Sequence, residues 1–229
     1  MKRSEVNAIM AEADSFIRAR GFHLPRFAYW TPSEWSAKRA QVTPIVNNWL
    51  GWDITDFGSG DFRRHGLFLF TLRNGEPENI RTRLGKTYAE KLMVVGVDQV
   101  TPLHFHWIKM EDIINRGGGR LVIQLYNSTL DEALAPSRIS VRVDGEERVV
   151  DPGGTLVLDP GESITLPPRL YHQFWGSGER VLVGEVSGVN NDRNDNRFYD
   201  PIARFPELEE DEPPLYLLCT DYARYVGLS

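Results

Sequence analysis

Hydrophobic and polar residues follow two different periods along this chain, and the change of period divides it into two parts. Between Ser4 and Gly21, apolar side chains recur every three or four positions, which predicts a helix with one buried stripe. Ser4 is its predicted N-cap and Gly21 its predicted end. A second helix is predicted after Thr31, because Thr31 and Glu34 match the two ends of a capping box.

After residue 66 the pattern changes to short apolar runs separated by turn residues, which is typical of β-strands. The predicted strands cover residues 67–72, 88–95, 121–126, 139–143, 148–150, 155–158, 163–166, 171–175, 181–187 and 215–219. Turns are predicted at Asn74-Gly75 and at Asp144-Gly145, the second of which closes a hairpin. Short strands at this regular spacing predict a mainly β fold, a sandwich or barrel that closes as a jelly roll.

The chain length fits one domain, residues 1–229, because sandwiches and barrels of this size often form a single core. Residues 1–65 are predicted to be a helical and aromatic-rich N-terminal extension that packs on the barrel. Two polar segments are interpreted as exposed to solvent. Residues 190–197 are read as a loop, with a place at the mouth of a pocket as the alternative, and residues 207–212 as an acidic linker.

Composition argues against several classes of function. The formal net charge of −6 opposes binding to nucleic acid, whose recognition depends on neutralising phosphates. No apolar run approaches the ~20 residues of a membrane helix, and the N-terminus lacks the apolar core of a signal peptide. The one cysteine, Cys219, has no partner for an internal disulfide and is predicted to be a packed thiol. The expected location is therefore the cytoplasm.

Three candidate metal ligands, His104, His106 and Glu111, lie close together in the sequence. A strand sends residues i and i+2 to the same face, so both imidazoles can point at one place while Phe105 packs on the other face. A turn near Lys109 would let the next strand bring the carboxylate of Glu111 to the same place. Two imidazoles and a carboxylate suit a divalent cation. The alternative is a pair of surface histidines on a strand.

Two motifs in the chain resemble those of the cupin superfamily. They are His104-x-His106-x4-Glu111-x6-Gly118 and Gly161-x5-Pro167-x-Arg169-x2-His172. Arg169 stands where a cupin usually has glycine, and Gly176 stands where it usually has asparagine. The resemblance implies that His172 joins the three upstream ligands around one metal ion inside a small β-barrel.

Residues 88–91 and 101–119, with further similarity at 182–187 and 217–222, resemble the D-lyxose isomerase family of manganese-dependent cupin sugar isomerases. The resemblance implies an aldose–ketose isomerase that interconverts D-lyxose with D-xylulose and, more slowly, D-mannose with D-fructose. It also implies a homodimer, and the exposed-looking aromatic residues of the N-terminal segment favour the same assembly. The expected partner is a monosaccharide, with no nucleic acid and no membrane.

A divalent metal held by three imidazoles and one carboxylate keeps two of its six positions for O1 and O2 of an open-chain aldose. Imidazole and oxygen ligands favour Mn²⁺, with Fe²⁺ or Co²⁺ as substitutes. The expected reaction is proton transfer through a metal-stabilised enediol. The sequence does not distinguish this route from a hydride shift.

The proton transfers need acid–base groups near the metal. Glu185 interrupts an apolar strand and shares a face with Val181, so burial is expected to raise the pKa of Glu185 and make it a general base. A structural ion pair is the alternative. Lys109 lies between the ligands, and Lys91 is chosen over its neighbour Glu90 because of the family resemblance. Both lysines are predicted to donate to the developing oxyanion, and the alternative is that either is simply exposed to solvent.

Trp107 and Gln124 are predicted to contact sugar hydroxyls, with packing and a sheet-face hydrogen bond as the respective alternatives. Two other functions fit the same ligands. One is an iron(II) cupin dioxygenase, which needs no paired acid and base, and the other is a sugar-binding sensor with a structural metal. The chain offers no helix-turn-helix or basic DNA-reading segment, which argues against the sensor.

Overall fold

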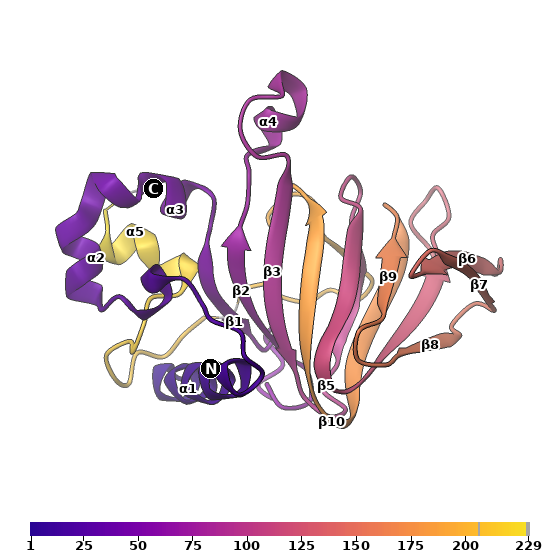
Figure 1. Cartoon of the computed structure of the whole chain (residues 1–229), viewed down its shortest axis with the longest axis horizontal. Helices are drawn as coiled ribbons and strands as arrows, with labels where there is room; N and C mark the ends of the chain where they lie inside the picture. Colours follow the sequence, from indigo (N-terminus) through magenta and orange to yellow (C-terminus); the bar gives the residue numbers. More distant parts are fainter. Residues whose placement is uncertain (206, 228–229) are drawn as a thin grey trace.

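Strands pair into one extended sheet that folds back on itself and forms most of the molecule (Figure 1). The computed structural model describes residues 1–205 and 207–227, apart from the side chains at positions 39 and 40. The strands are β1 (Gly51–Thr55), β2 (Leu67–Arg73), β3 (Tyr88–Val95), β4 (Thr101–Phe105), β5 (Glu111–Asn127), β6 (Ile139–Val143), β7 (Glu146–Val150), β8 (Thr155–Leu158), β9 (Ser163–Leu166), β10 (Leu170–Gly188) and β11 (Arg197–Phe198). The main path is β1-β2-β3-β10-β5-β9-β6-β7, and β4, β8 and β11 join it through β10, β5 and β4. The predicted mainly β fold is confirmed.

Two long strands, β5 and β10, run antiparallel beside each other. Both continue through the bend of the sheet and so belong to each of its two halves. Their pairing shifts between Ser177 and Val181, and Gly117 and Gly118 have positive φ angles of 127° and 101°. A Cβ atom at Gly118 would lie 2.1 Å from the carbonyl oxygen of Arg180. Glycine therefore allows the bend here, and β5 pairs with β9 before the bend and with β8 after it.

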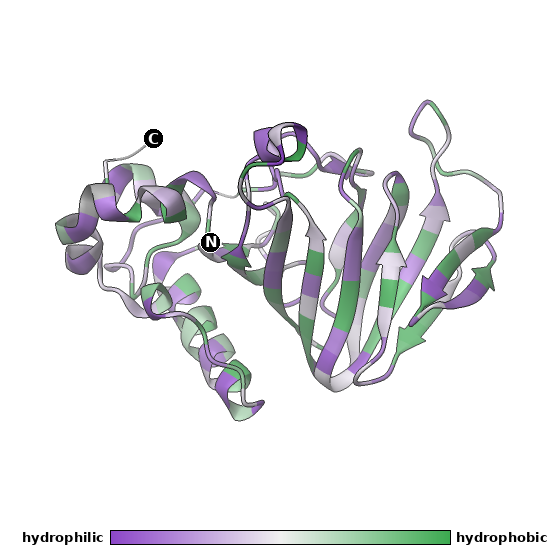
Figure 2. Ribbon diagram, turned by 45° about the horizontal axis from the view of Figure 1, so that its top comes forward, coloured by the Kyte–Doolittle hydropathy of each residue, from purple (hydrophilic) through white to green (hydrophobic). Residues whose placement is uncertain are grey.

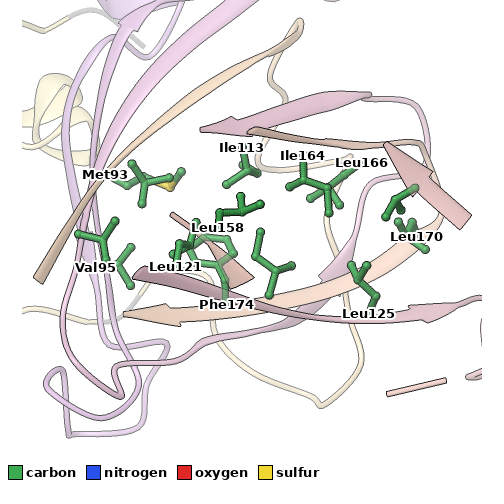
Figure 3. Packing of buried hydrophobic residues seen from close by; sticks show 14 of the residues in the cluster. Met93, Val95, Ile113, Leu121, Leu125, Leu158, Ile164, Leu166, Leu170 and Phe174 are labelled. Atoms are coloured by element: carbon green, nitrogen blue, oxygen red, sulfur yellow. The ribbon is translucent and has the colours of Figure 1, made fainter. Parts of the chain in front are cut away.

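The bent sheet encloses the main hydrophobic core. Alternate residues of each strand point inward, which gives the alternating hydrophobic and hydrophilic bands along the ribbons (Figure 2). The inward side chains of both halves pack against one another (Figure 3), and they include Met93, Val95, Ile113, Leu121, Leu125, Leu158, Ile164, Leu166, Leu170 and Phe174. The same alternation places charged residues of β3, β5 and β10 beside this core, where they form the site described below.

Helix α1 (Arg3–Ala19) covers the outer face of β1, β2 and β3. Its apolar stripe contacts the outward side chains of these strands; the two sets are Val6, Met10, Ala13 and Ile17, and Trp52, Ile54, Phe68, Phe70, Leu92 and Val94. The predicted first helix is confirmed, and Gly21, with φ of 71°, follows its end. β1 belongs to the sheet, so the prediction of a helical extension over residues 1–65 is wrong for residues 51–55.

The other helices are short. They are α2 (Pro32–Lys38), α3 (Thr43–Asn47), α4 (Pro77–Thr82) and α5 (Tyr222–Tyr225), with 3₁₀ turns η1 (Arg26–Tyr29), η2 (Arg39–Val42) and η3 (Cys219–Asp221). The predicted capping box is confirmed, because the N–H of Thr31 donates to Glu34 Oε2 at 2.8 Å and the N–H of Glu34 donates to Thr31 Oγ1 at 3.3 Å. Of the helices in the described residues, none is long and apolar enough to cross a membrane.

The C-terminal segment departs from the predicted strand at residues 215–219. Leu217 and Cys219 instead pack with Trp35 and Tyr222 in a small cluster beside α2. The thiol of Cys219 is buried and forms no disulfide, and burial raises its pKa well above the usual value. The predicted packed thiol is therefore confirmed.

The predicted acidic linker is exposed over most of its length, as expected, but it also binds the start of α1. Arg3 is fully buried, and its guanidinium donates to Asp221 at 2.8 and 3.0 Å and to Glu210 at 2.7 and 2.9 Å. Ser4 does not cap the helix as predicted, because its hydroxyl donates to Asp211 at 2.6 Å. Ionic contacts thus join the two ends of the described chain.

Replacing Arg3 by methionine is expected to lower the free energy of unfolding by about 3–5 kcal/mol, because Asp221 would remain buried without its cation. For a chain of this size the melting temperature should fall by roughly 6–20 °C, which circular dichroism measures. Arg18→Met on the same helix is the matched control. The ion pair of Arg18 with Asp14 is half exposed, so its loss should cost less than about 1 kcal/mol. Equal melting temperatures for the two variants would contradict this account.

Candidate metal centre and active site

The four predicted metal ligands come together in the interior of the barrel. His104 lies in β4, His106 follows that strand, Glu111 begins β5, and His172 lies near the start of β10. One nitrogen from each histidine lies within 4.8 Å of the other two. Oε1 of Glu111 lies 3.0 Å from His172 Nε2 and 3.5 Å from His106 Nε2. The turn between β4 and β5 returns the carboxylate as predicted, and Phe105 is buried on the other face.

Backbone carbonyls orient the three imidazole rings. In each ring Nδ1 donates to a carbonyl: His104 to Pro102 at 2.7 Å, His106 to Asp195 at 2.6 Å and His172 to Leu170 at 3.0 Å. Such bonds select the tautomer with its lone pair on Nε2, the form in which histidine binds a metal. Nε2 of His172 is buried 3.0 Å from Glu111 Oε1, but with the proton on Nδ1 both atoms are acceptors, so no hydrogen bond joins them. Burial, reinforced by the rings of His172 and His106, keeps the pKa of His104 well below its usual value. These donors fit a divalent cation.

Glu111 is ionised, as a metal ligand must be. Burial alone would raise the pKa of its carboxyl, but Lys109 and His106 hold that pKa well below the usual value. Lys109 Nζ lies 2.7 Å from Glu111 Oε2 and 2.8 Å from Glu185 Oε1. Burial lowers the pKa of Lys109, but these two carboxylates outweigh it and raise the pKa. Lys109 therefore engages one oxygen of Glu111 and leaves Oε1 facing the histidines.

Glu185 lies in the second half of β10 and is the register partner of Lys91 in β3. Lys91 Nζ lies 3.3 Å from Glu185 Oε1 and donates to Asn190 Oδ1 at 2.6 Å. Lys109 contacts the same oxygen of Glu185, so Oε2 is the oxygen available to a bound molecule. Glu90 points to the opposite face, where it pairs with an arginine of β2.

The predicted rise in the pKa of Glu185 is wrong. Burial does favour the protonated carboxyl, but the ammonium groups of Lys109 and Lys91 outweigh it and lower the pKa. The ion pair that was the alternative interpretation is therefore present. Glu185 is ionised in this pairing and holds the lone pair that a proton acceptor needs.

Four polar side chains of the pocket, Thr101 among them, were not identified as site residues from the sequence. Asp192, Asn196 and Arg204 line the same pocket as the ligands and the lysines. Arg204 Nη2 lies 2.5 Å from Asp53 Oδ2 and 3.4 Å from Asp192 Oδ2. Segment 190–197 is thus part of the pocket wall, and its interpretation as a solvated loop is wrong. Its asparagines and aspartates were the available signal, but they are equally typical of surface turns.

Apart from Thr101, the rest of the pocket wall is apolar. Its side chains are Phe57, Leu67, Leu69, Met93, Ile113, Phe174 and Phe198. An apolar wall strengthens the electrostatic interactions of the charged groups that it surrounds. The pocket can therefore hold a cation, a proton acceptor and several hydrogen-bonding groups around one small polar molecule.

The model of the D-lyxose isomerase family matches residues 1–222. The chain belongs to the D-lyxose isomerase family. Two relatives, both named D-lyxose/D-mannose isomerase, match almost throughout. The protein of Serratia proteamaculans is 48% identical over 231 residues, covering 99% of this chain and all of the relative, and that of Escherichia coli O157:H7 is 47% identical over 229 residues, covering 98% and 100%. The resemblance read from the motifs is confirmed.

Membership of the D-lyxose isomerase family makes this chain an isomerase and supports aldose–ketose isomerase activity. It decides against the dioxygenase and the sensor. Solved L-ribose isomerases share the fold. The Cellulomonas parahominis enzyme with L-ribose has a TM-score of 0.57 at 19% identity, covering 92% of this chain and 97% of its own, and the Geodermatophilus obscurus enzyme has 0.55 at 17%, covering 91% and 98%. The predicted cupin-type barrel with N-terminal helices is confirmed.

This D-lyxose isomerase family member has Arg169 where the second cupin motif usually has glycine, and Arg169 takes a glycine-like conformation. Its φ is 65°, a left-handed value that costs a residue with a side chain some strain. Its N–H donates to the carbonyl of His106 at 2.7 Å, its guanidinium donates to the carbonyl of Thr129 at 3.1 Å, and the guanidinium carbon lies 5.3 Å from the ring centroid of Phe105. These contacts hold the turn without disturbing the ligands.

The two predicted sugar contacts do not lie in the pocket lining. Trp107 Nε1 donates to Glu132 Oε1 at 2.7 Å, and Gln124 Nε2 donates to the carbonyl of Gly153 at 2.9 Å. Gln124 is on the outer face of β5, because the adjacent Ile123 is buried in the core. Their placement supports the alternatives, packing for Trp107 and a sheet-face hydrogen bond for Gln124.

Proposed function

We propose that this protein interconverts D-lyxose with D-xylulose, and more slowly D-mannose with D-fructose, using one Mn²⁺ ion held by His104, His106, His172 and Glu111. The observation that carries the proposal is the meeting of these ligands with Glu185 and two lysines in one pocket. The choice of sugars is supported by the two relatives at 48% and 47% identity, which are named D-lyxose/D-mannose isomerase.

The donor set supports the choice of metal. Imidazole and carboxylate ligands suit Mn²⁺, and Fe²⁺ or Co²⁺ are proposed as substitutes. When bound, the ion would polarise the carbonyl of the open-chain sugar as a Lewis acid. The ligands are already oriented for this ion. The three Nδ1 atoms donate to backbone carbonyls, and Lys109 binds Oε2 of Glu111.

Glu185 is proposed as the general base. It takes the proton from C2 of the aldose and returns it to C1, while a second proton passes from O2 to O1, so that the sugar goes through an enediol. Lys91 and Lys109 hold Oε1 of Glu185 and leave Oε2 for this transfer. Both lysines also place positive charge where the sugar oxygens become negative.

The polar residues farther along the wall are proposed to bind the remaining hydroxyls. Asp192 offers acceptor oxygens, and Asn196 and Arg204 offer donors, in a pocket whose other side is apolar. Such a wall suits a neutral monosaccharide. A cytoplasmic location and a homodimer remain predictions.

Metal-free protein reloaded with a single metal tests the proposal. Protein stripped with a chelator is reloaded with Mn²⁺, Fe²⁺, Co²⁺ or Zn²⁺ and assayed for ketose formation from a panel of pentoses and hexoses. We expect Mn²⁺ to restore the highest rate, with D-lyxose faster than D-mannose. Zn²⁺ should restore little, because it favours four ligands and fewer open positions. Lack of conversion with every metal overturns the proposal.

A further inference from the structure

Asp195 is a buried carboxylate outside the pocket lining that binds the turn between the ligand strands. It is 6% exposed. Its Oδ1 accepts the N–H of Ile108 at 2.9 Å, and its Oδ2 accepts the N–H of Lys109 at 3.0 Å. Its own carbonyl accepts Nδ1–H of His106 at 2.6 Å. A buried carboxylate is costly unless it is bonded in this way, so these contacts specify where Asp195 lies.

The turn depends on these bonds because the sheet does not supply them. β4 ends at Phe105 and β5 begins at Glu111, so the backbone between them lies outside the strand ladder. Buried backbone N–H groups need a partner, and the carboxylate of Asp195 provides one for two successive residues. The side chain of Ile108 is 76% exposed, so its packing does not fix the turn.

His106 differs from the other two histidines in what orients its ring. The Nδ1 atoms of His104 and His172 donate to carbonyls two residues earlier in their own segments. The ring of His106 is held by a residue 89 positions later. The direction of its Nε2 therefore depends on the segment that contains Asp195.

Lys109 depends on the same contact. Its backbone N–H is bonded to Asp195, and its Nζ bridges Glu111 Oε2 at 2.7 Å and Glu185 Oε1 at 2.8 Å. A shift of this backbone would move the ammonium group away from both carboxylates. The side chain of Asp195 thus holds the backbone of Lys109, the residue that contacts the proposed base, while the backbone carbonyl of Asp195 orients the ligand His106.

We propose that Asp195 is a positioning residue, which sets His106 for the metal and Lys109 for Glu185 without touching the metal or the sugar. The inference rests on the proposed function and extends it to segment 190–197. This segment then has two tasks, since other residues in it line the pocket while Asp195 secures the ligand turn.

Asp195→Ala is compared with Asp200→Ala, which removes an exposed carboxylate from the adjoining segment. Asp195→Ala keeps the carbonyl that accepts Nδ1–H of His106 but removes the carboxylate that ties this carbonyl to the ligand turn. Calorimetric titration of metal-free protein with Mn²⁺ should therefore show an affinity ~10–100-fold weaker, the range for disturbing an outer partner of a metal ligand. Asp200→Ala should bind like the wild type. At saturating Mn²⁺, kcat of Asp195→Ala should fall at least ~10-fold, with a smaller change in KM, because a small misplacement of catalytic groups is costly.

The melting temperature of each metal-free variant separates positioning from folding. A purely structural Asp195 would lower the melting temperature but leave Mn²⁺ affinity and kcat of the folded protein unchanged, and that result overturns the inference. Asp195→Asn keeps the shape of the side chain and one acceptor oxygen, so its Mn²⁺ affinity should be intermediate. This variant takes the place of Asp195→Ala if the alanine variant does not fold. A wild type that binds Mn²⁺ but converts no sugar removes the proposed function, whereas the calorimetric comparison still tests the effect on His106.

Discussion

Replacing Glu185 by glutamine is expected to lower kcat for D-lyxose at least ~100-fold, because the amide cannot accept the proton that leaves the sugar carbon. Mn²⁺ affinity should change little, since Glu185 reaches the ligand Glu111 only through the ammonium group of Lys109. Steady-state kinetics at saturating Mn²⁺ measure the first quantity, and calorimetric titration measures the second.

Glu90→Gln is the matched control for this variant. Glu90 lies one position from Lys91 in β3, but it points to the opposite face, where it pairs with an arginine of β2. The glutamine there should leave kcat as in the wild type. A Glu185→Gln enzyme whose kcat stays within ~10-fold of the wild type would remove Glu185 as the base. A large loss of kcat in Glu90→Gln would instead indicate that the general base lies on the other face of β3.

The ligands could be predicted from the sequence because local rules govern them. Strand alternation put His104 on the face opposite Phe105, and a short turn was enough to return Glu111. His172 needed the family resemblance, since its place beside His104 depends on the pairing of β4 with β10. The alternation that places Glu185 on the face of Val181 was also visible, but its pKa depended on Lys109, which comes from the turn between β4 and β5, and on Lys91 of β3.

The features that sequence reasoning missed depend on contacts between distant segments. Arg204 reaches the pocket from a segment with no regular structure, and its place is fixed by Asp53 on β1. Arg3 and Glu210 are 207 positions apart, yet their ion pair attaches the acidic run to the start of α1. A charge-rich segment has the same composition whether it is solvated or forms ion pairs. Its contacts therefore become visible only when the folded structure shows which residues lie beside it.

His172→Ala is expected to weaken Mn²⁺ binding by more than the ~10–100-fold typical of losing an outer partner of a ligand, because it removes a ligand itself. Nε2 of His172 is buried and faces Glu111 Oε1 at 3.0 Å, so two acceptor atoms lie beside each other and a bound cation would satisfy both. Mn²⁺ at 100 times the wild-type Kd should stabilise the wild type by about 2.7 kcal/mol, but a variant that binds 100-fold more weakly by only about 0.4 kcal/mol.

The difference should appear as a Mn²⁺-induced rise in melting temperature that is roughly 5–9 °C larger for the wild type than for His172→Ala. The rise, rather than the melting temperature itself, is the relevant quantity, because Glu111 Oε1 lies 3.0 Å from His172 Nε2 and the metal-free protein is therefore altered too. His23→Ala, at an exposed histidine outside the pocket, should show the wild-type rise. If His172→Ala shows the same Mn²⁺-induced rise in melting temperature as the wild type, His172 is not a metal ligand. The two cupin-like sequence motifs would then not share one metal site.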